Sequence, residues 1–191
     1  MPRQKRYIAE NGWYHVVNRG AARRHIFLND ELKEIFLKIL EYVAKKYEFK
    51  IVAFCIMGNH YHLLINTVHA NLSNGMRSLN AIYAQSFNKY RKKDGPVFRG
   101  RYQSTFIENH HYLNNVVRYI HLNPESAGIV QKNDRYYWSS HIDYQENQSR
   151  FDWLYKITWN SINDYKKYIN SGNSEKILDY YKKNRKNCIL N

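Results

Sequence analysis

The chain has 191 residues, of which 43% are hydrophobic, and this apolar share excludes a wholly disordered protein. Its length fits one domain with an elaboration or two small domains. Lys and Arg number 30 against 16 Asp and Glu, which gives a formal net charge of +14. The longest apolar run, residues 51–57, is far shorter than the roughly 18 residues of a membrane span. Two cysteines cannot form a disulfide framework or a cysteine-based zinc site. We expect a cytoplasmic protein.

Positive charge is spread through the chain, and aromatic residues make up 16% of it, including 18 Tyr. Cations bind phosphates and flat rings stack on unpaired bases, so this composition favours a nucleic-acid surface. A merely solvated basic surface, or one that binds acidic lipid, is the alternative.

The first elements in chain order are predicted to be a strand, a helix and a strand. Residues 13–18 (WYHVVN) are rich in β-branched and aromatic residues, which predicts a strand. Apolar residues between positions 32 and 43 recur at helical spacing, and Asn29 or Asp30 can cap the start of that helix. The apolar run at 51–57 predicts a buried strand.

The next elements complete a known order. A turn at Gly58-Asn59 separates that strand from another at 60–66, a helix is predicted over 72–90, and a strand over 98–108. This β-α-β-β-α-β order is the split arrangement of ferredoxin-like domains, an α+β class. We therefore expect an antiparallel sheet with helices on one face and with the first and third strands as its central pair.

A further helix is predicted over 110–122, ending at Asn123-Pro124 because the residue before a proline is pushed out of helical geometry. Beyond it we expect a C-terminal extension, residues 131–191, packed on a main domain of residues 1–130. The stretch at 161–187 is predicted to be helical.

Two histidines begin the strand at 60–66. Side chains alternate along a strand, so His60 and His62 point the same way and Tyr61 points to the other face. Two imidazoles on one face can bind one divalent cation. Taken alone, the pattern is weak evidence for a metal site and also fits a pair of surface histidines.

The helix predicted at 110–122 presents a tyrosine beside an amide. Tyr119 and Asn123 are four residues apart and therefore neighbours on a shoulder about 90° from the buried stripe of the helix. A phenol one turn from an amide oxygen can serve as a nucleophile beside a metal ligand, or simply as surface packing. Tyr112 lies on the same shoulder and is the rival nucleophile, whereas His121 projects away from Tyr119 and is not expected to be catalytic.

Four segments resemble one family in order and spacing. They are MGNHYHLLI (57–65), VFRGRYQSTFIE (97–108), RYIHLNPESAGIV (118–130) and YYWSSHIDY (136–144). They are similar to the single-tyrosine HUH transposases, which are IS200-like, and most of all to the REP-associated branch. The resemblance spans about residues 7–160. Gly58 stands where the family often has proline.

This resemblance implies a metal-dependent DNA strand transferase that acts on single-stranded, hairpin-containing DNA. His60 and His62 would bind Mg²⁺ or Mn²⁺, Tyr119 would be the nucleophile and Asn123 the third metal ligand, where insertion-sequence relatives commonly have the longer Gln. The Tyr119 oxygen would attack phosphorus, giving a 5′-phosphotyrosine and a free 3′-hydroxyl, and the covalent step would conserve the bond energy for rejoining. The chain has no phosphate loop for ATP, which agrees with such a reaction. Insertion-sequence relatives resemble obligate dimers that share active sites, whereas the REP-associated branch resembles monomers. The C-terminal tail through Trp159 favours a monomer over a homodimer here.

Basic residues near the predicted strand and helix ends are the candidate DNA contacts. They are Arg19, Arg23, Arg24, Lys89, Arg91, Lys92, Lys93, Arg99 and Arg101, with Arg3, Lys5 and Arg6 as a possible arm. Two other functions stay open: a non-catalytic, domesticated binder of structured nucleic acid, and a metal hydrolase that uses activated water and leaves no protein attached.

Overall fold

The computed structural model describes residues 7–108, 112–132, 134–146 and 148–171. Its strands are β1 (Gly12–Arg19), β2 (Phe49–Ile56), β3 (His60–Thr67) and β4 (Gln103–Phe106). Its α-helices are α1 (Asp30–Tyr47), α2 (Leu72–Arg91), α3 (Leu113–Ser126), α4 (His141–Gln145) and α5 (Ile162–Ser171), with a 3-10 turn, η1, at Ala21–Arg23. No helix of this described part combines the length and the apolar character needed to cross a bilayer.

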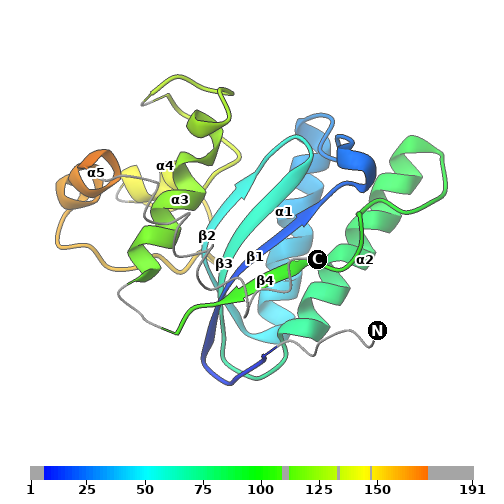
Figure 1. Cartoon of the computed structure of the whole chain (residues 1–191), viewed down its shortest axis with the longest axis horizontal. Coiled ribbons are helices and arrows are strands. Elements are labelled where there is room, and N and C mark those ends of the chain that lie inside the picture. The colour runs from blue at the N-terminus through cyan, green and yellow to red at the C-terminus, as the bar shows by residue number, and fades with distance from the viewer. Residues whose placement is uncertain (1–6, 109–111, 133, 147, 172–191) are drawn as a thin grey trace.

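The four strands form one sheet in the order β2-β3-β1-β4, and every pairing is antiparallel (Figure 1). The first and third strands are therefore the central pair, as the ferredoxin-like order predicts. In the β1–β3 ladder, Val17 lies opposite His62 and Arg19 opposite His60. The α+β, ferredoxin-like prediction is confirmed.

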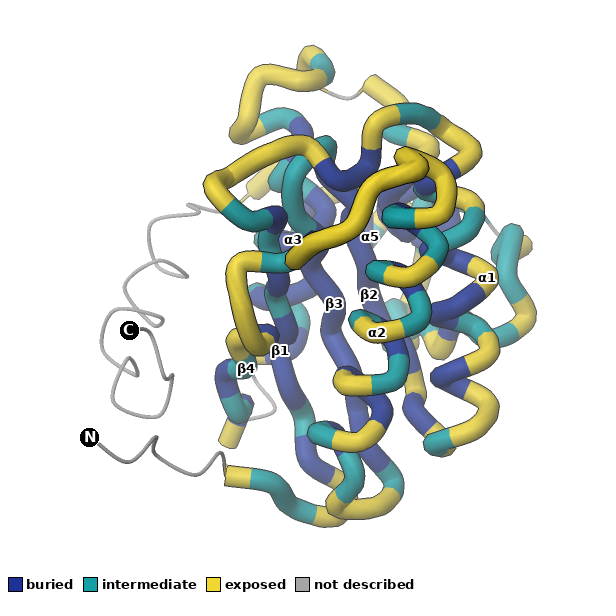
Figure 2. Tube along the Cα trace, turned by 90° about the vertical axis from the view of Figure 1, so that its right-hand side faces the viewer, coloured by how far each residue is buried: buried dark blue, intermediate teal, exposed yellow. Residues whose placement is uncertain are grey.

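Helices cover both faces of the sheet. Figure 1 shows α1 and α2 on one side and α3, α4 and α5 on the other. Alternation along β3 matches this layering: Tyr61, Leu63 and Ile65 join the core under α1 and α2, and Leu64 joins the core under α3. Strands β1, β2 and β3 are consequently buried along most of their length, whereas only Thr105 of β4 is buried (Figure 2). The two helices of the ferredoxin-like order, α1 and α2, share one face as predicted, and α3, which carries Tyr119, lies on the opposite face.

Helix α1 begins where the sequence placed its cap. The Asn29 side chain accepts a hydrogen bond from the backbone N–H of Leu32 at 3.1 Å, which satisfies one of the unpaired donors of the first turn. Helices α1 and α2 end at residues with left-handed backbone geometry, Glu48 and Lys92.

Two elements differ most from their predicted bounds. The strand predicted over 98–108 is regular only from Gln103 to Phe106, because Phe98 bridges Gly20 and the chain then leaves the ladder. The helix predicted to stop at Asn123 continues to Ser126 with Pro124 inside its last turn. A proline there forfeits one backbone hydrogen bond, and the bond from the N–H of Ala127 to the carbonyl of Asn123 (3.0 Å) keeps the turn closed.

The described residues beyond 131 pack on the sheet and on α3. Trp138 and Leu154 belong to the core under α1 and α2, and Tyr144 and Tyr165 to the core under α3. The short helix α4 was not predicted, whereas α5 confirms the first part of the helix predicted over 161–187. The rest of that helix, Cys188 and the Arg3, Lys5 and Arg6 arm lie outside the described residues. The division into 1–130 and 131–191 stays a prediction.

Candidate active site

The two histidines of β3 lie on the same face of the sheet, at its α3 side. His62 is 5% exposed and His60 is half-buried, and their ring centroids are 5.0 Å apart. Tyr61, between them, points to the other face, where its ring packs on Phe36 and its hydroxyl donates to Asn80 Oδ1 at 2.9 Å. The expected alternation is confirmed, and the two histidines are not a fully exposed surface pair.

Each of these imidazoles uses Nδ1 in a contact with the protein. His60 Nδ1 lies 2.6 Å from Asn59 Oδ1, and His62 Nδ1 lies 2.9 Å from His15 Nε2. Within the described part of the chain, no hydrogen bond reaches Nε2 of either ring. These two Nε2 atoms are therefore the ones available to a ligand.

His15, on β1, is a member of this cluster that the sequence analysis missed. Its ring is 6% exposed and stacks on the His62 ring, with centroids 5.2 Å apart and planes 9° from parallel. In the register of the ladder His15 lies opposite Leu64, so His62 is its diagonal neighbour on the same face. The His in WYHVVN was visible in the sequence, but the strand register that brings it to His62 was not.

Tyr119 is brought to the histidines by α3. Val116, Val117 and Ile120 bury the apolar stripe of α3 against the sheet, as predicted. The Tyr119 ring then stands edge-on to the rings of both His15 and His62, with centroids 5.7 Å apart in each case. A tyrosine and the histidine pair, separated by more than fifty residues in the sequence, thus form one cluster.

The rival tyrosine lies at the N-terminal end of the same helix. Tyr112 is the N-cap of α3 and is 36% exposed. Seven helical residues correspond to about 10 Å along the axis. Of the two, Tyr119 is the one whose ring contacts the histidines.

Asn123 lies one turn beyond Tyr119. Its Nδ2 donates to the backbone carbonyl of Tyr119 at 2.9 Å, a bond in which the side-chain Oδ1 takes no part. Burial raises the pKa of the Tyr119 phenol, and a hydrogen bond from the Asn123 side chain lowers it in part. The phenol is therefore protonated at neutral pH and needs help to act as a nucleophile.

All three imidazoles of the cluster are neutral at neutral pH. Burial lowers the pKa of His15 to about 3 and that of His62 well below its usual value, with nearby imidazoles adding to the effect at His62. Burial and then the charge of Arg19 lower the pKa of His60 to about 4. Neutral imidazole is the form that binds metal ions.

The side chains of the site fit a divalent cation that takes only some of its ligands from the protein. In the described residues no group of three or more His, Cys, Asp or Glu side chains is arranged to hold an ion. What the site offers is two neutral imidazoles with unused Nε2 atoms, their Nδ1 atoms fixed in the way typical of metal-binding histidines, and the Asn123 amide nearby. Such a set leaves coordination positions for water or for oxygens of a substrate.

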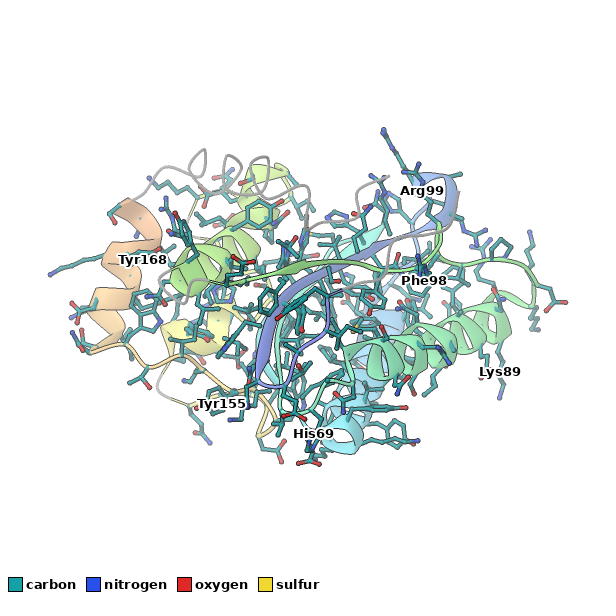
Figure 3. The ribbon with its side chains drawn as sticks, turned by 60° about the horizontal axis from the view of Figure 1, so that its bottom comes forward. His69, Lys89, Phe98, Arg99, Tyr155 and Tyr168 are labelled. Carbon is teal, nitrogen blue, oxygen red and sulfur yellow. The ribbon has the colours of Figure 1, made fainter. Side chains whose placement is uncertain are left out.

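The predicted basic residues gather at the end of the sheet where β1 ends and β3 begins. All except the half-buried Arg19 are exposed. The loops that hold them are joined by backbone hydrogen bonds, from Ala21 to Val97 (2.9 Å) and from Arg99 to Arg19 (2.9 Å). Figure 3 shows Arg99, Phe98 and Lys89 toward one end of the molecule and Tyr168 of α5 toward the other.

His121, set aside by the sequence analysis, lies in a different cluster. It is 3% exposed, and its ring nitrogens contact the Tyr165 hydroxyl at 2.7 Å and Ser140 Oγ at 2.8 Å. Cys55 is fully buried, as expected of a small core side chain.

Comparison with known proteins identifies the family of this chain. The model of the family described as "Transposase IS200 like" matches residues 8–123. A solved REP-associated tyrosine transposase bound to a REP hairpin has a similar fold, with 20% identity, 85% of this chain and 96% of that chain covered, and a TM-score of 0.64. A putative transposase from Deinococcus radiodurans is 19% identical, covering 63% of this chain and 95% of its own, with a TM-score of 0.44. No curated protein matches significantly. Because the family model covers more than half of the chain, this protein belongs to the IS200-like transposase family.

Proposed function

We propose that this transposase cleaves and rejoins single-stranded, hairpin-containing DNA through a covalent bond to Tyr119. The observation that carries the proposal is the contact of the Tyr119 ring with the His62 ring, next to two unused imidazole nitrogens. This contact places a candidate nucleophile from α3 beside a candidate metal-binding pair from β3. Their meeting is what phosphodiester chemistry requires.

In the proposed reaction the Tyr119 hydroxyl oxygen attacks the scissile phosphorus. The bond between phosphorus and the 3′-oxygen breaks, the phenolic proton ends on that oxygen, and a 5′-phosphotyrosine is left on the protein. A second 3′-hydroxyl then attacks the phosphotyrosine, which restores the phenol and joins a new strand. The half-buried position of Tyr119 reduces the access of water that would otherwise hydrolyse the covalent bond.

His60 and His62 would hold a divalent cation, Mg²⁺ or Mn²⁺, and Asn123 would supply an amide oxygen to it. When bound, the ion supplies Lewis-acid stabilisation of charge on the scissile phosphate. The protein's own contribution is to fix the two rings through Asn59 and His15, so that both present Nε2.

The basic end of the sheet would bind the DNA backbone. Arg23, Arg24, Arg99 and Arg101 are exposed and take part in no ion pair among the described residues, so their charges are available to phosphates. Lys89, Arg91, Lys92 and Lys93 extend this surface along the end of α2. The proposal of hairpin DNA as the ligand is supported by the similar fold of the REP-associated transposase, which was solved with a REP hairpin.

The test is covalent capture. A labelled single-stranded oligonucleotide with a hairpin, incubated with the protein and Mn²⁺, should give a protein–DNA adduct that survives denaturing electrophoresis. Tyr119→Phe should give none, while Tyr112→Phe, the matched control on the same helix, should give wild-type amounts.

Three outcomes would contradict the proposal. An adduct formed by Tyr119→Phe would show another nucleophile, with Tyr112 tested first. Cleavage without attached protein would favour hydrolysis by activated water. Tight, chelator-resistant binding with no cleavage of any hairpin would favour a domesticated DNA-binding protein.

A further inference from the structure

We propose that His15 is a positioning residue that fixes the tautomer of His62, and so decides whether His62 can bind the metal ion. This inference rests on the proposed function, because it concerns the same site. It starts from the short contact between His15 Nε2 and His62 Nδ1 (2.9 Å). Neither ring has room to turn away, since both are almost fully buried and they stack nearly parallel.

A hydrogen bond between two neutral imidazoles has only two forms. In one, His62 Nδ1 carries the proton and donates to His15 Nε2, which leaves the lone pair of His62 on Nε2. In the other, His15 Nε2 donates to His62 Nδ1, and His62 then carries its own proton on Nε2. Only the first form lets His62 bind a cation through Nε2, so the tautomer of His15 controls the site.

The neighbouring histidine shows which form the site requires. Asn59 Oδ1 can only accept a hydrogen bond, so His60 Nδ1 is the donor and the lone pair of His60 is on Nε2. For both rings to bind one ion, His62 must have the same tautomer as His60. His15 must then accept, as Asn59 does, and it takes the place of the backbone carbonyl or carboxylate that usually fixes a metal-binding histidine.

The sheet holds this arrangement firmly. β1 and β3 are the two central strands, and their ladder runs without interruption from Gly12 opposite Thr67 to Arg19 opposite His60. Tyr119 also contacts both rings edge-on. We therefore expect a substitution of His15 to affect His62 through the loss of their hydrogen bond more than through a shift of the backbone.

Two measurements on the full chain test the assignment without relying on activity. Long-range ¹H–¹⁵N NMR of metal-free protein labelled at histidine should show the His62 proton on Nδ1. Titration with Mn²⁺, followed by electron paramagnetic resonance of the free ion, should show His15→Phe binding about 10- to 100-fold more weakly than wild type. His15→Gln, whose side-chain oxygen can accept, should recover most of that loss.

The control is His69→Phe. His69 follows the end of β3 that is opposite to His60 (Figure 3). Among the described residues, the side chain of His69 forms a hydrogen bond only with Glu48. Mn²⁺ binding should therefore be unchanged in this variant. A proton on Nε2 of His62, or equal Mn²⁺ affinity of wild type and folded His15→Phe, would overturn the proposal. A wild-type chain that binds no Mn²⁺ would instead contradict the metal site, and the NMR result would still decide which ring donates.

Discussion

Two clusters of buried and half-buried histidines lie on the α3 side of the sheet, and they differ in what their ring nitrogens contact. In the site cluster, formed by His15, His60 and His62, the two β3 histidines each have one nitrogen that no described residue uses. In the docking cluster, formed by His121 and His141 where α3, α4 and α5 meet, every ring nitrogen has a protein partner.

The docking cluster is organised around one hydroxyl. The Tyr165 hydroxyl lies within hydrogen-bond distance of Nδ1 of both His121 and His141, and Ser140 and Gln145 contact the remaining nitrogens. A buried polar network that is fully satisfied stabilises one arrangement of the chain. This cluster therefore holds α5 on α3 and leaves nothing for a ligand.

Burial and pKa do not separate the two clusters. Burial lowers the pKa of His141 to about 4 and that of His121 well below its usual value, just as it does in the site cluster. What distinguishes the site cluster is that Nε2 of His60 and Nε2 of His62 have no hydrogen bond from a described residue, and that these atoms lie near Tyr119 and the basic loops. Nearby, Arg19 contributes to lowering the pKa of His60. Histidines with shifted pKa values indicate a functional site only when the structure leaves a ring nitrogen available to a ligand.

The largest contrast is expected from histidine substitutions in the two clusters. His62→Ala removes one of the two metal-binding imidazoles, so Mn²⁺-dependent adduct formation should fall at least about 100-fold. His141→Gln keeps a hydrogen-bonding side chain in the docking cluster, so adduct formed per folded molecule should be unchanged. Equal losses in both variants, measured by denaturing electrophoresis, would contradict the division of roles.

Acid should destabilise the fold through the buried histidines. The unfolded chain binds protons at histidine near pH 6.5, whereas His141 in the folded chain resists protonation until about pH 4. Between these values the unfolded state binds more protons at His141, so its contribution to the free energy of unfolding falls as pH falls and levels off below pH 4. His141 alone contributes up to about 3 kcal/mol to this fall.

Thermal unfolding between pH 7 and pH 4.5 measures this effect. His141→Gln should flatten the pH dependence while lowering stability at pH 7. A wild-type midpoint that stays constant over this range would contradict the neutral, buried state of these rings.

Removing the Tyr165 hydroxyl, which contacts both histidines of the docking cluster, should lower the free energy of unfolding more than removing another hydroxyl of α5. Tyr165→Phe leaves two buried imidazole nitrogens without their partner, which should cost about 1–3 kcal/mol of unfolding free energy in urea titration. Tyr168→Phe, also on α5, removes a half-buried bond to Asn115 and should cost less. The reverse order would mean that the docking cluster is not what holds α5.

The smallest effect is expected at the basic loops near the site cluster. Arg99→Gln should weaken binding of a hairpin oligonucleotide a few-fold and reduce the slope of log affinity against log salt by about 0.7–0.9, the value for one phosphate contact. Arg135→Gln, whose side chain pairs with Glu146 away from these loops, is the charge-matched control. If both variants changed the slope equally, binding would depend on net charge alone.

The periodicity of the sequence was sufficient to predict the fold, but it predicted the candidate site only in part. Alternation along β3 was sufficient to place His60 and His62 on one face, and the helical stripe at Val116, Val117 and Ile120 was sufficient to orient α3. His15 was missed because periodicity gives the face of a strand but not its register against a neighbour. The continuation of α3 past Pro124 depends on tertiary packing of a buried proline, which a local rule cannot see.

The most direct test of the account is to identify the residue that becomes joined to DNA. The wild-type chain would be incubated with Mn²⁺ and a hairpin oligonucleotide, digested with nuclease and protease, and examined by tandem mass spectrometry. The account predicts a nucleotide-bearing phosphate on Tyr119 that forms only in the presence of the metal ion. The same modification on Tyr112 or another residue, or an adduct that forms equally well with chelator, would contradict it.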